Sequence, residues 1–355
     1  MYEDRTTHSH ANLGCVSHIV AASPDGPRGD PVRSPQLARD IKNLMLTCLE
    51  HGRLIDDKAQ VRRYPESRLL EYKAEHEVRV RMVTAVSGAT FTEVLIVKVP
   101  LDGGRDAEIG EEVFDAILPD FPLNEVPRRV DLTDLGRVVD AATVKKAADS
   151  LRRRIRHVLR TRQEEGVTAG LSVFAIAPIS LLVYLGSQLG DLVAVRVFQR
   201  QRDRDNWMWK PDVADGQEEI FEVRAPDDDD DDVSGEVVLA VDVSARVPDS
   251  GIGAVLPGSR RYRLSAVKPS VDFLQRRQQV TVFGIQIRDV LDRVARENSE
   301  LKVLHVFAAV PTPIAIELGR HLRVHIPQVQ MYEYKKEDRS YWASLDFVPA
   351  DVGDD

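Results

Sequence analysis

Two stretches of the chain share one pattern, LSVFAIAPISLLVYLGSQL at residues 171–189 and LHVFAAVPTPIAIELGRHL at residues 304–322. Three pairs of matching residues are each separated by 133 positions, with no gap between them: Phe174 and Phe307, Pro178 and Pro311, and Gly186 and Gly319. A repeat with such a long period predicts two copies of one structural unit. The fold of this region should therefore follow from one unit and its duplication.

Each copy has the same order of predicted elements. An amphipathic helix comes first, at residues 144–159 or 285–297, and a strand closes the unit, at residues 193–201 or 327–335. Between them, an apolar strand ends at a proline that opens another helix, where its missing N–H costs nothing. This order predicts an α/β fold with two parallel, Rossmann-like halves.

Folds of this class bind ligands at the carboxyl ends of their strands, where free N–H groups of the next helix face anions. Pro178 and Pro311 mark these helix starts and are candidate ligand-binding positions. Two halves side by side would form a cleft suited to a ligand with several phosphates. The repeat alone is equally compatible with an old duplication that binds nothing.

Composition limits the class of protein. A chain of 355 residues predicts two or three domains, and its 43% apolar and 30% charged residues are typical of soluble globular proteins. We find no signal peptide and no apolar run of about 18 residues, so we expect a cytoplasmic protein without a membrane partner. Cys15 and Cys48 are the only cysteines, which fits a reducing compartment.

The net charge of −9 argues against broad coating of nucleic acid, although a local basic face could still bind a phosphate backbone. Part of the acidity is local, because residues 227–232 are an unbroken run of aspartates. We expect a solvated acidic loop over residues 226–235.

The amino-terminal stretch CVSHIVAASPDGPRGD, residues 15–30, predicts a short strand that stops at His18 and a long loop after it. Beyond this loop, residues 38–56 predict a short helix, residues 65–83 a second helix and residues 90–100 a strand. A histidine in this position is, by itself, more often an ordinary side chain beside a turn than a catalytic one.

The repeated region resembles the SAVED domain, a doubled CARF-like sensor of cyclic oligonucleotides in bacterial anti-phage (CBASS) signalling. The resemblance is carried by FAIAPISLLVYLG with the trailing NWMW at 206–209, and by FAAVPTPIAIELGRHL with the trailing MYEY at 331–334. It covers roughly residues 85–350, with halves at about 85–225 and 236–350. It implies a cyclic di- or trinucleotide as ligand, and a homo-oligomer that forms when the ligand binds.

Residues 1–78 resemble the HNH endonuclease module, a small ββα-metal fold that precedes SAVED in one class of effector. The matching segments are SHIVAASPDGPRGD, NLMLTCLEHGRLID and YPESRLLEYKAEHE. The resemblance implies hydrolysis of double-stranded DNA with little sequence preference, helped by Mg²⁺ or another divalent ion. It makes His18 the general base, which takes a proton from water, and Asn43 the residue that holds the loop and the site geometry.

The chain departs from the HNH pattern in the metal-binding part. Family members have Cys-x-x-His-His where this chain has Cys48, His51 and then Gly52. The first histidine of the pair holds structural zinc and the second serves the active site. Either His51 takes over the active-site role, therefore, or metal binding is impaired.

A structural Zn²⁺ ion needs four ligands, and only Cys48 and His51 match the family. The family's upstream cysteine pair would fall before Met1, so the module is expected to be incomplete at this end. Either the start codon is placed too late, or the zinc site has decayed. His8, His10 and Cys15 are a weaker alternative, because their positions do not match the family.

Two sets of residues near the strand ends are further candidates for ligand binding. The basic set is Arg200, Arg202 and Arg204, since arginine pairs with phosphate oxygens in a bidentate way. The aromatic set is Trp207, Trp209, Tyr332 and Tyr334. Exposed aromatic rings would form a platform on which bases stack, whereas buried ones would only pack.

Three functions follow from these observations. The first is a metal-dependent HNH endonuclease activated by a cyclic nucleotide. The second is a cyclic-nucleotide sensor whose HNH module is inactive, motivated by Gly52 and the absent cysteine pair. The third, weaker one is a restriction-type nuclease that needs no second messenger.

Overall fold

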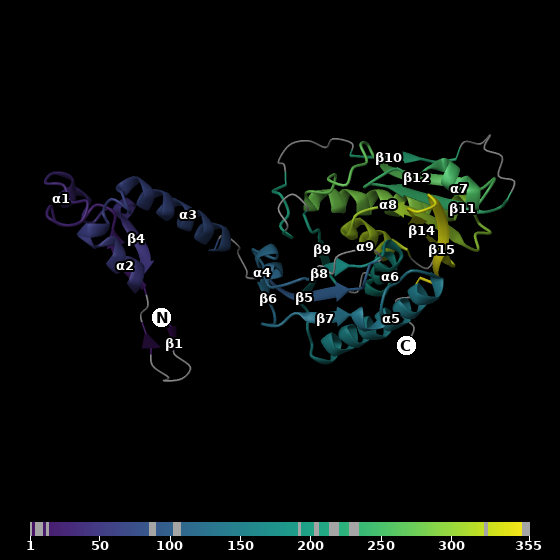
Figure 1. Ribbon diagram of the computed structural model, residues 1–355, viewed down its shortest axis with the longest axis horizontal. Coiled ribbons are helices and arrows are strands. Elements are labelled where there is room, and N and C mark those ends of the chain that lie inside the picture. The colour runs from purple at the N-terminus through teal and green to yellow at the C-terminus, as the bar shows by residue number, and fades with distance from the viewer. Residues whose placement is uncertain are drawn as a thin grey trace. The chain divides into compact units, whose positions relative to one another are not determined.

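A computed structural model of the chain describes residues 2–3, 10–11, 14–84, 90–101, 108–190, 193–201, 206–212, 220–226, 234–322 and 326–349. The chain divides into two compact units, Met1–Gly88 and Ala89–Asp355, which we call unit 1 and unit 2. Their elements are labelled in Figure 1. Among the helices of the described residues, none is long and apolar enough to cross a membrane.

Unit 1 is built around an antiparallel strand pair followed by a helix. β3 (Gly14–His18) pairs with β4 (Leu44–Cys48), and α2 (Leu49–Ile55) continues directly from β4. The other elements are β1 (Tyr2–Glu3), β2 (His10–Ala11), α1 (Arg33–Leu37), α3 (Glu66–Thr84) and two 3₁₀ turns, Ile41–Asn43 and Lys58–Gln60. The buried core is small, with Met45 and Tyr64 packed against Ile19, Ile55 and Leu69.

The helix expected over residues 38–56 is wrong for its middle part, because Leu44–Cys48 forms a strand. Side chains alternate along it as they do in strands, with Leu46 63% exposed and Thr47 hydrogen-bonded to the neighbouring strand. The helix begins only after Cys48, whose sulfur accepts a backbone N–H of its first turn. Pairing with β3 therefore overrides the helical pattern.

The first half of unit 2 holds a parallel sheet in the order β6-β5-β8-β9, with β7 also paired to β5. Its strands are β5 (Phe91–Lys98), β6 (Phe121–Pro122), β7 (Arg128–Asp131), β8 (Gly170–Ile176) and β9 (Val195–Phe198). Its helices are α4 (Glu112–Ala116), α5 (Ala141–Glu164) and α6 (Ile179–Leu189), with a 3₁₀ turn at Thr133–Leu135.

The second half holds a sheet in the order β10-β12-β11-β13-β14-β15, parallel in the middle and antiparallel at both edges. Its strands are β10 (Phe221–Arg224), β11 (Val237–Asp242), β12 (Arg260–Ala266), β13 (Leu304–Ala309), β14 (Val329–Lys335) and β15 (Ser340–Phe347). Its helices are α7 (Asp249–Val255), α8 (Arg277–Glu297) and α9 (Thr312–His321). The predicted parallel halves are confirmed, since β8 pairs in parallel with β9 and β13 with β14.

Helices α6 and α9 pack against each other between the two sheets (Figure 1). A Cβ atom at Gly186 would overlap the carbonyl oxygen of Ile316, and one at Gly319 would overlap that of Val183. Val183 and Ile316 are themselves 133 positions apart, so the contact is reciprocal. The two repeat glycines let the helix backbones touch, because glycine has no side chain to hold them apart.

Each half also carries an aromatic stack at the same place. Phe174 stacks on Phe198 with ring centroids 4.5 Å apart, and Phe307 stacks on Tyr332 at 4.2 Å. A third ring meets each stack edge-on: Trp207 in the first half and Tyr341 in the second. The two copies thus share their apolar framework down to individual rings.

Candidate functional site

A cavity of about 410 Å³ lies in unit 2 at the carboxyl end of β9. One wall is the segment after β9, residues 199–201, and the other is the loop between β12 and α8: Val271, Asp272, Leu274 and Gln275. The two walls belong to different halves of the repeat. The cavity therefore lies where the duplicated fold predicts a cleft.

Lys210 connects the two halves beside this cavity. Its backbone N–H donates to the carbonyl oxygen of Gln275 at 3.0 Å, and its ammonium group donates to Gln275 Oε1 at 2.7 Å. Gln275 also donates its side-chain amide to the carbonyl oxygen of Asp272. These bonds hold the second wall of the cavity in a fixed position relative to the first half.

Pro178 and Pro311 are the N-cap residues of α6 and α9. The start of α6 is already in contact with an anionic group, because Glu333 Oε1 accepts the N–H of Ser180 at 2.8 Å and its hydroxyl at 2.9 Å. Burial raises the pKa of Glu333. A carboxylate of the protein thus lies where the helix N-terminus would stabilise a ligand anion.

Of the two alternatives for the aromatic set, an exposed platform or buried packing, the structure shows buried packing for Trp207 and Tyr332. Trp207 is 1% exposed and Tyr332 is 6% exposed, because both rings belong to the aromatic stacks. The Tyr332 hydroxyl is hydrogen-bonded to Nδ1 of His305 at 2.9 Å, and Nε2 of His305 lies 2.7 Å from Glu236. Burial raises the pKa of Tyr332 to about 12. Both side chains are part of the core.

The remaining residues predicted to bind the ligand differ in their exposure. Tyr334 is 45% exposed and lies beside Tyr341, whereas Trp209 is partly buried against the core. Among the described residues, no hydrogen-bond partner reaches Nε1 of Trp207 or Trp209. Arg200 lines the cavity. Two of the candidates lie outside the described residues: Arg202 and Arg204.

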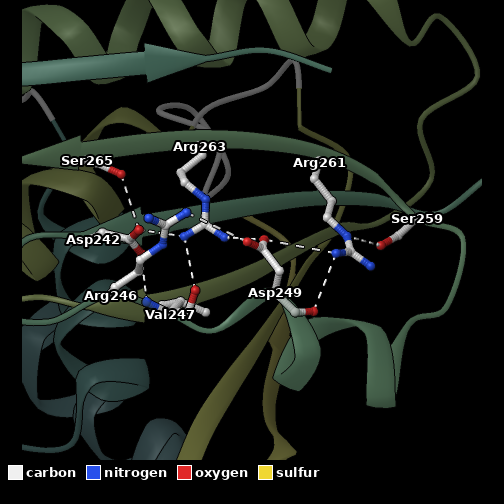
Figure 2. A network of polar contacts seen from close by, with 8 residues as sticks. All are labelled: Asp242, Arg246, Val247, Asp249, Ser259, Arg261, Arg263 and Ser265. Atoms are coloured by element: carbon white, nitrogen blue, oxygen red, sulfur yellow. Dashed lines mark hydrogen bonds and ion pairs between the residues drawn. The ribbon is translucent and has the colours of Figure 1, made fainter. Parts of the chain in front are cut away.

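A charged network at the carboxyl end of β11 was not anticipated from the sequence (Figure 2). Asp242 is 1% exposed, and its Oδ2 accepts Nη1–H of Arg263 at 2.5 Å and the hydroxyl of Ser265 at 3.1 Å. Its Oδ1 accepts the N–H of Val247 at 3.0 Å, and Arg263 also bonds Asp249 at 2.6 Å. The only sequence signal is the alternation of polar residues in RRYRLSA, residues 260–266.

In unit 1, His18 ends β3, and its Nε2 lies 3.0 Å from the carbonyl oxygen of Ala38. A carbonyl oxygen only accepts, so in the neutral ring the proton sits on Nε2 and Nδ1 keeps its lone pair. Asn43 is buried and bonds both backbone groups of Val20, accepting the N–H at 2.8 Å and donating to the carbonyl at 2.8 Å. Asn43 thereby fixes the chain just after His18.

Arg28 is a second residue that the sequence analysis missed. It donates to three carbonyl oxygens, those of Ile19 at 2.6 Å, Ile55 at 3.0 Å and Tyr64 at 3.3 Å. Its backbone has a φ of 56°, which is unusual for a residue other than glycine. Burial lowers the pKa of Arg28. This side chain ties the segment after β3 to the end of α2 and to the segment before α3.

Cys48 and His51 lie side by side, with Sγ 3.1 Å from Nδ1. The backbone N–H of His51 lowers the pKa of the Cys48 thiol. In the part of the chain that the structure describes, no group of three His, Cys, Asp or Glu side chains could hold a metal ion. Gly52 packs so closely that a Cβ there would collide with Cys15 Sγ. These donors do not fit a four-ligand zinc site, and His8 lies outside the described residues.

Comparison with solved structures finds the Cap4 SAVED/CARF-domain containing receptors. With the Acinetobacter baumannii receptor bound to the cyclic trinucleotide 3'3'3'-cAAA, identity is 14% and the TM-score 0.48, over 83% of this chain and 60% of that one. With the Moraxella osloensis receptor, identity is 11% and the TM-score 0.40, over 88% and 63%. This chain therefore spans about 60% of the length of those receptors.

No curated protein matches the chain. Residues 151–347 match the family model of SAVED, described as the SMODS-associated and fused to various effectors sensor domain. The match covers more than half of the chain and includes both repeat motifs, the cavity walls and the α6–α9 contact. The chain belongs to the SAVED family.

Proposed function

We propose that this chain is a CBASS effector: unit 2 binds a cyclic di- or trinucleotide, and unit 1 then cleaves double-stranded DNA. The observation that carries the proposal is the cavity at the carboxyl end of β9, between two repeat-related halves of a SAVED chain. A ligand that fills this cavity touches both halves at once. Binding can therefore change the equilibrium between arrangements of the protein, including its assembly into a homo-oligomer.

The walls of the cavity match the two kinds of group in a cyclic nucleotide. Arg200 supplies a cationic group of the type that pairs with phosphate. The amide side chains of Gln199 and Gln201 supply hydrogen-bonding groups of the type that pair with bases. The chemistry of the walls supports a ligand that contains both.

For unit 1 we propose hydrolysis of a DNA phosphodiester by water. The water oxygen attacks phosphorus, the bond from phosphorus to the leaving sugar oxygen breaks, and Nδ1 of His18 takes the proton of the water. The contact of Nε2 with Ala38 supports this role because it orients the ring and leaves Nδ1 unprotonated. Asn43 supports the same role of His18, because its hydrogen bonds fix Val20, two residues after His18.

A divalent ion such as Mg²⁺ would supply positive charge for the scissile phosphate. The residues described in unit 1 bring no three ligating side chains together, so their geometry assigns this ion no position. The roles proposed for the protein's own side chains are therefore limited to those of His18 and Asn43.

The test is digestion of plasmid DNA by the full chain with Mg²⁺, with and without a panel of cyclic di- and trinucleotides. We expect degradation only with a particular ligand, loss of cleavage in His18→Ala, and full cleavage in His157→Ala, a control at an exposed histidine on α5. Light scattering with the same ligand should show an increase in mass. Cleavage without any ligand would contradict the proposal and indicate a restriction-type nuclease.

Gly52 favours a second candidate function, a cyclic-nucleotide sensor with an inactive amino-terminal unit. Gly52 has no side chain that could bind a metal ion, and its contact with Cys15 leaves no space for a larger side chain. This candidate predicts ligand binding by calorimetry together with intact plasmid in every lane. The same two measurements thus separate the sensor from the nuclease.

A further inference from the structure

Two amide groups in the cavity wall have atoms without a hydrogen-bond partner. Among the described residues, no partner reaches Oε1 of Gln199 or Nε2 of Gln201, and both atoms are buried. The whole Gln201 side chain is also well shielded, at 6% exposed. Buried polar atoms are normally paired, so these two atoms are suited to pair with a bound molecule.

The orientation of the Gln199 amide follows from its surroundings. The Nε2 of Gln199 donates to the carbonyl oxygen of Arg200 at 3.0 Å, which makes Oε1 the unpaired atom. The backbone of Gln201 is fixed, since its N–H donates to the carbonyl oxygen of Asn206 at 2.6 Å. Gln199 and Gln201 are two positions apart and line the same cavity. The wall thus presents an acceptor at Gln199 Oε1 and, next to it, the side-chain amide of Gln201.

The opposite wall is different, because the side chain of Gln275 is already paired. Its Oε1 accepts from Lys210 and its Nε2 donates to the carbonyl oxygen of Asp272. Leu274 adds an apolar, 4% exposed surface on the same side. The remaining polar side chain of this wall is Asp272, whose carboxylate can only accept when ionised. A planar group inserted between the walls would therefore find an amide donor only on the edge toward residues 199–201.

We propose that this cavity holds one base of the ligand, and that Gln199 Oε1 and the side-chain amide of Gln201 pair with its hydrogen-bonding edge. Every nucleobase has a donor and an acceptor side by side, and a glutamine amide pairs with them in the same way as in base readout. The proposal rests on the proposed function of unit 2 and adds the residues that determine which base is accepted. Arg200 lines the same cavity and is the candidate for contact with a phosphate.

The main test is Gln201→Met in the full chain, studied by calorimetric titration with cyclic di-AMP, cyclic di-GMP, cyclic GMP-AMP and cyclic tri-AMP. Methionine is apolar and similar in size, so it removes the donor without emptying the space. We expect the affinity for the best ligand to fall by about tenfold or more, as for the loss of a base contact. Because Nε2 has no partner in the free protein, the melting temperature should not fall. A purely structural role would lower the melting temperature instead.

Two controls complete the test. Gln278→Met changes an exposed glutamine on α8 outside the cavity and should leave affinity unchanged. Gln199→Glu keeps an acceptor at this position, whereas Gln199→Leu removes it. Only the leucine variant should therefore lose affinity for a ligand whose base donates a hydrogen bond to residue 199. The ligands that lose affinity identify the base as adenine or guanine.

The outcomes distinguish failure of this inference from failure of the proposed function. If the wild-type chain binds a cyclic nucleotide and Gln201→Met binds it equally well, the base is read elsewhere and this inference is wrong, while the proposed function stands. If the wild-type chain binds no member of the panel and no free nucleoside, the proposed function of unit 2 and this inference both fail.

Discussion

The two halves of unit 2 share their apolar framework but differ in the polar groups at their strand ends. The pairing registers make Phe198 equivalent to Tyr332, because each lies opposite a repeat phenylalanine, Phe174 or Phe307. The next residues are then Gln199 in the first half and Glu333 in the second. Glu333 closes the start of α6 by bonding Ser180, whereas the position equivalent to Ser180 in α9 is Pro313, which has no N–H.

The same registers make Lys98 equivalent to Asp242 and Arg129 equivalent to Arg263. In the second half these positions form the buried pair of Figure 2, whereas in the first half both are basic and Arg129 is exposed. The two copies of the duplicated fold therefore share their packing, whereas the charged side chains at their strand ends differ. In the second half the side chains at the strand ends are paired with each other, whereas in the first half the end of β9 borders the cavity.

The strongest test of this difference is Arg263→Leu against Arg129→Leu. Removing Arg263 leaves the buried carboxylate of Asp242 without its cation, which should lower the free energy of unfolding by about 3 kcal/mol or more. The equivalent Arg129→Leu should cost less than about 1 kcal/mol. Urea denaturation of both variants gives the values. Equal losses of unfolding free energy would show that the two arginines contribute equally to stability, and would contradict the difference between the two strand ends.

The shared framework is tested by Gly186→Ala and Gly319→Ala. Each added Cβ meets a backbone carbonyl of the other helix, so each variant should lose about 2 kcal/mol, and the two losses should agree. Gly253→Ala in α7 is the matched control, because its Cβ would make only an ordinary 3.4 Å contact with the end of the Arg261 side chain. It should be neutral or slightly stabilising, through the higher helix propensity of alanine. A large loss in only one repeat glycine would contradict the reciprocal contact.

The aromatic stacks allow a smaller test, Tyr332→Phe. The variant makes the second stack chemically like the first, where Phe198 has no hydroxyl. It also leaves Nδ1 of His305 without its partner, so the free energy of unfolding should fall by about 1 kcal/mol. Thermal denaturation is the measurement, and Phe198→Tyr is not expected to give a compensating gain. A variant as stable as the wild type would mean that the hydroxyl bond contributes nothing.

The smallest expected effect is that of Glu333→Gln, and it depends on pH. Burial raises the pKa of Glu333, so the folded chain binds this proton more tightly than the unfolded chain. Stability should therefore fall as the pH rises from the ordinary glutamate pKa, about 4.3, through the raised value. Glutamine has no such proton, so above that window the variant should be equally stable or slightly more stable.

Urea denaturation between about pH 4 and 8 tests this expectation. Glu337→Gln, at an exposed glutamate just after β14, is the control and should keep the wild-type pH profile. An identical profile for Glu333→Gln would show that Glu333 does not titrate differently in the folded chain.

The repeat predicted the larger part of unit 2, because apolar periodicity and the proline and glycine positions reflect packing that both copies share. The pairs that give each strand end its charge were not predictable. Asp242 and Arg263 are 21 residues apart and meet only when β11 and β12 pair. Glu333 and Ser180 come from different halves, 153 positions apart. Such contacts depend on the packing of the halves, which no local pattern encodes.

The errors have equally physical causes. Residues 44–48 read as helix because their own pattern permits it, but pairing with β3 makes them a strand. The sequence left open whether Trp207 is exposed or buried, because polar residues surround it, and its ring packs beside Phe174. In unit 1, Arg28 joins three backbone segments, although it lies within a stretch whose sequence predicts only a loop.

The reciprocal contact of Gly186 and Gly319 also bears on the origin of the chain. An isologous contact, in which each partner offers the same surface, is what two identical molecules form around a twofold axis. A single ancestral half could thus have made this interface with a second copy of itself, and one glycine codon would have served both sides. In such a dimer every substitution appears twice. Fusion into one gene removes that constraint, so that one copy could acquire Glu333 while the other kept Gln199 beside an open cavity.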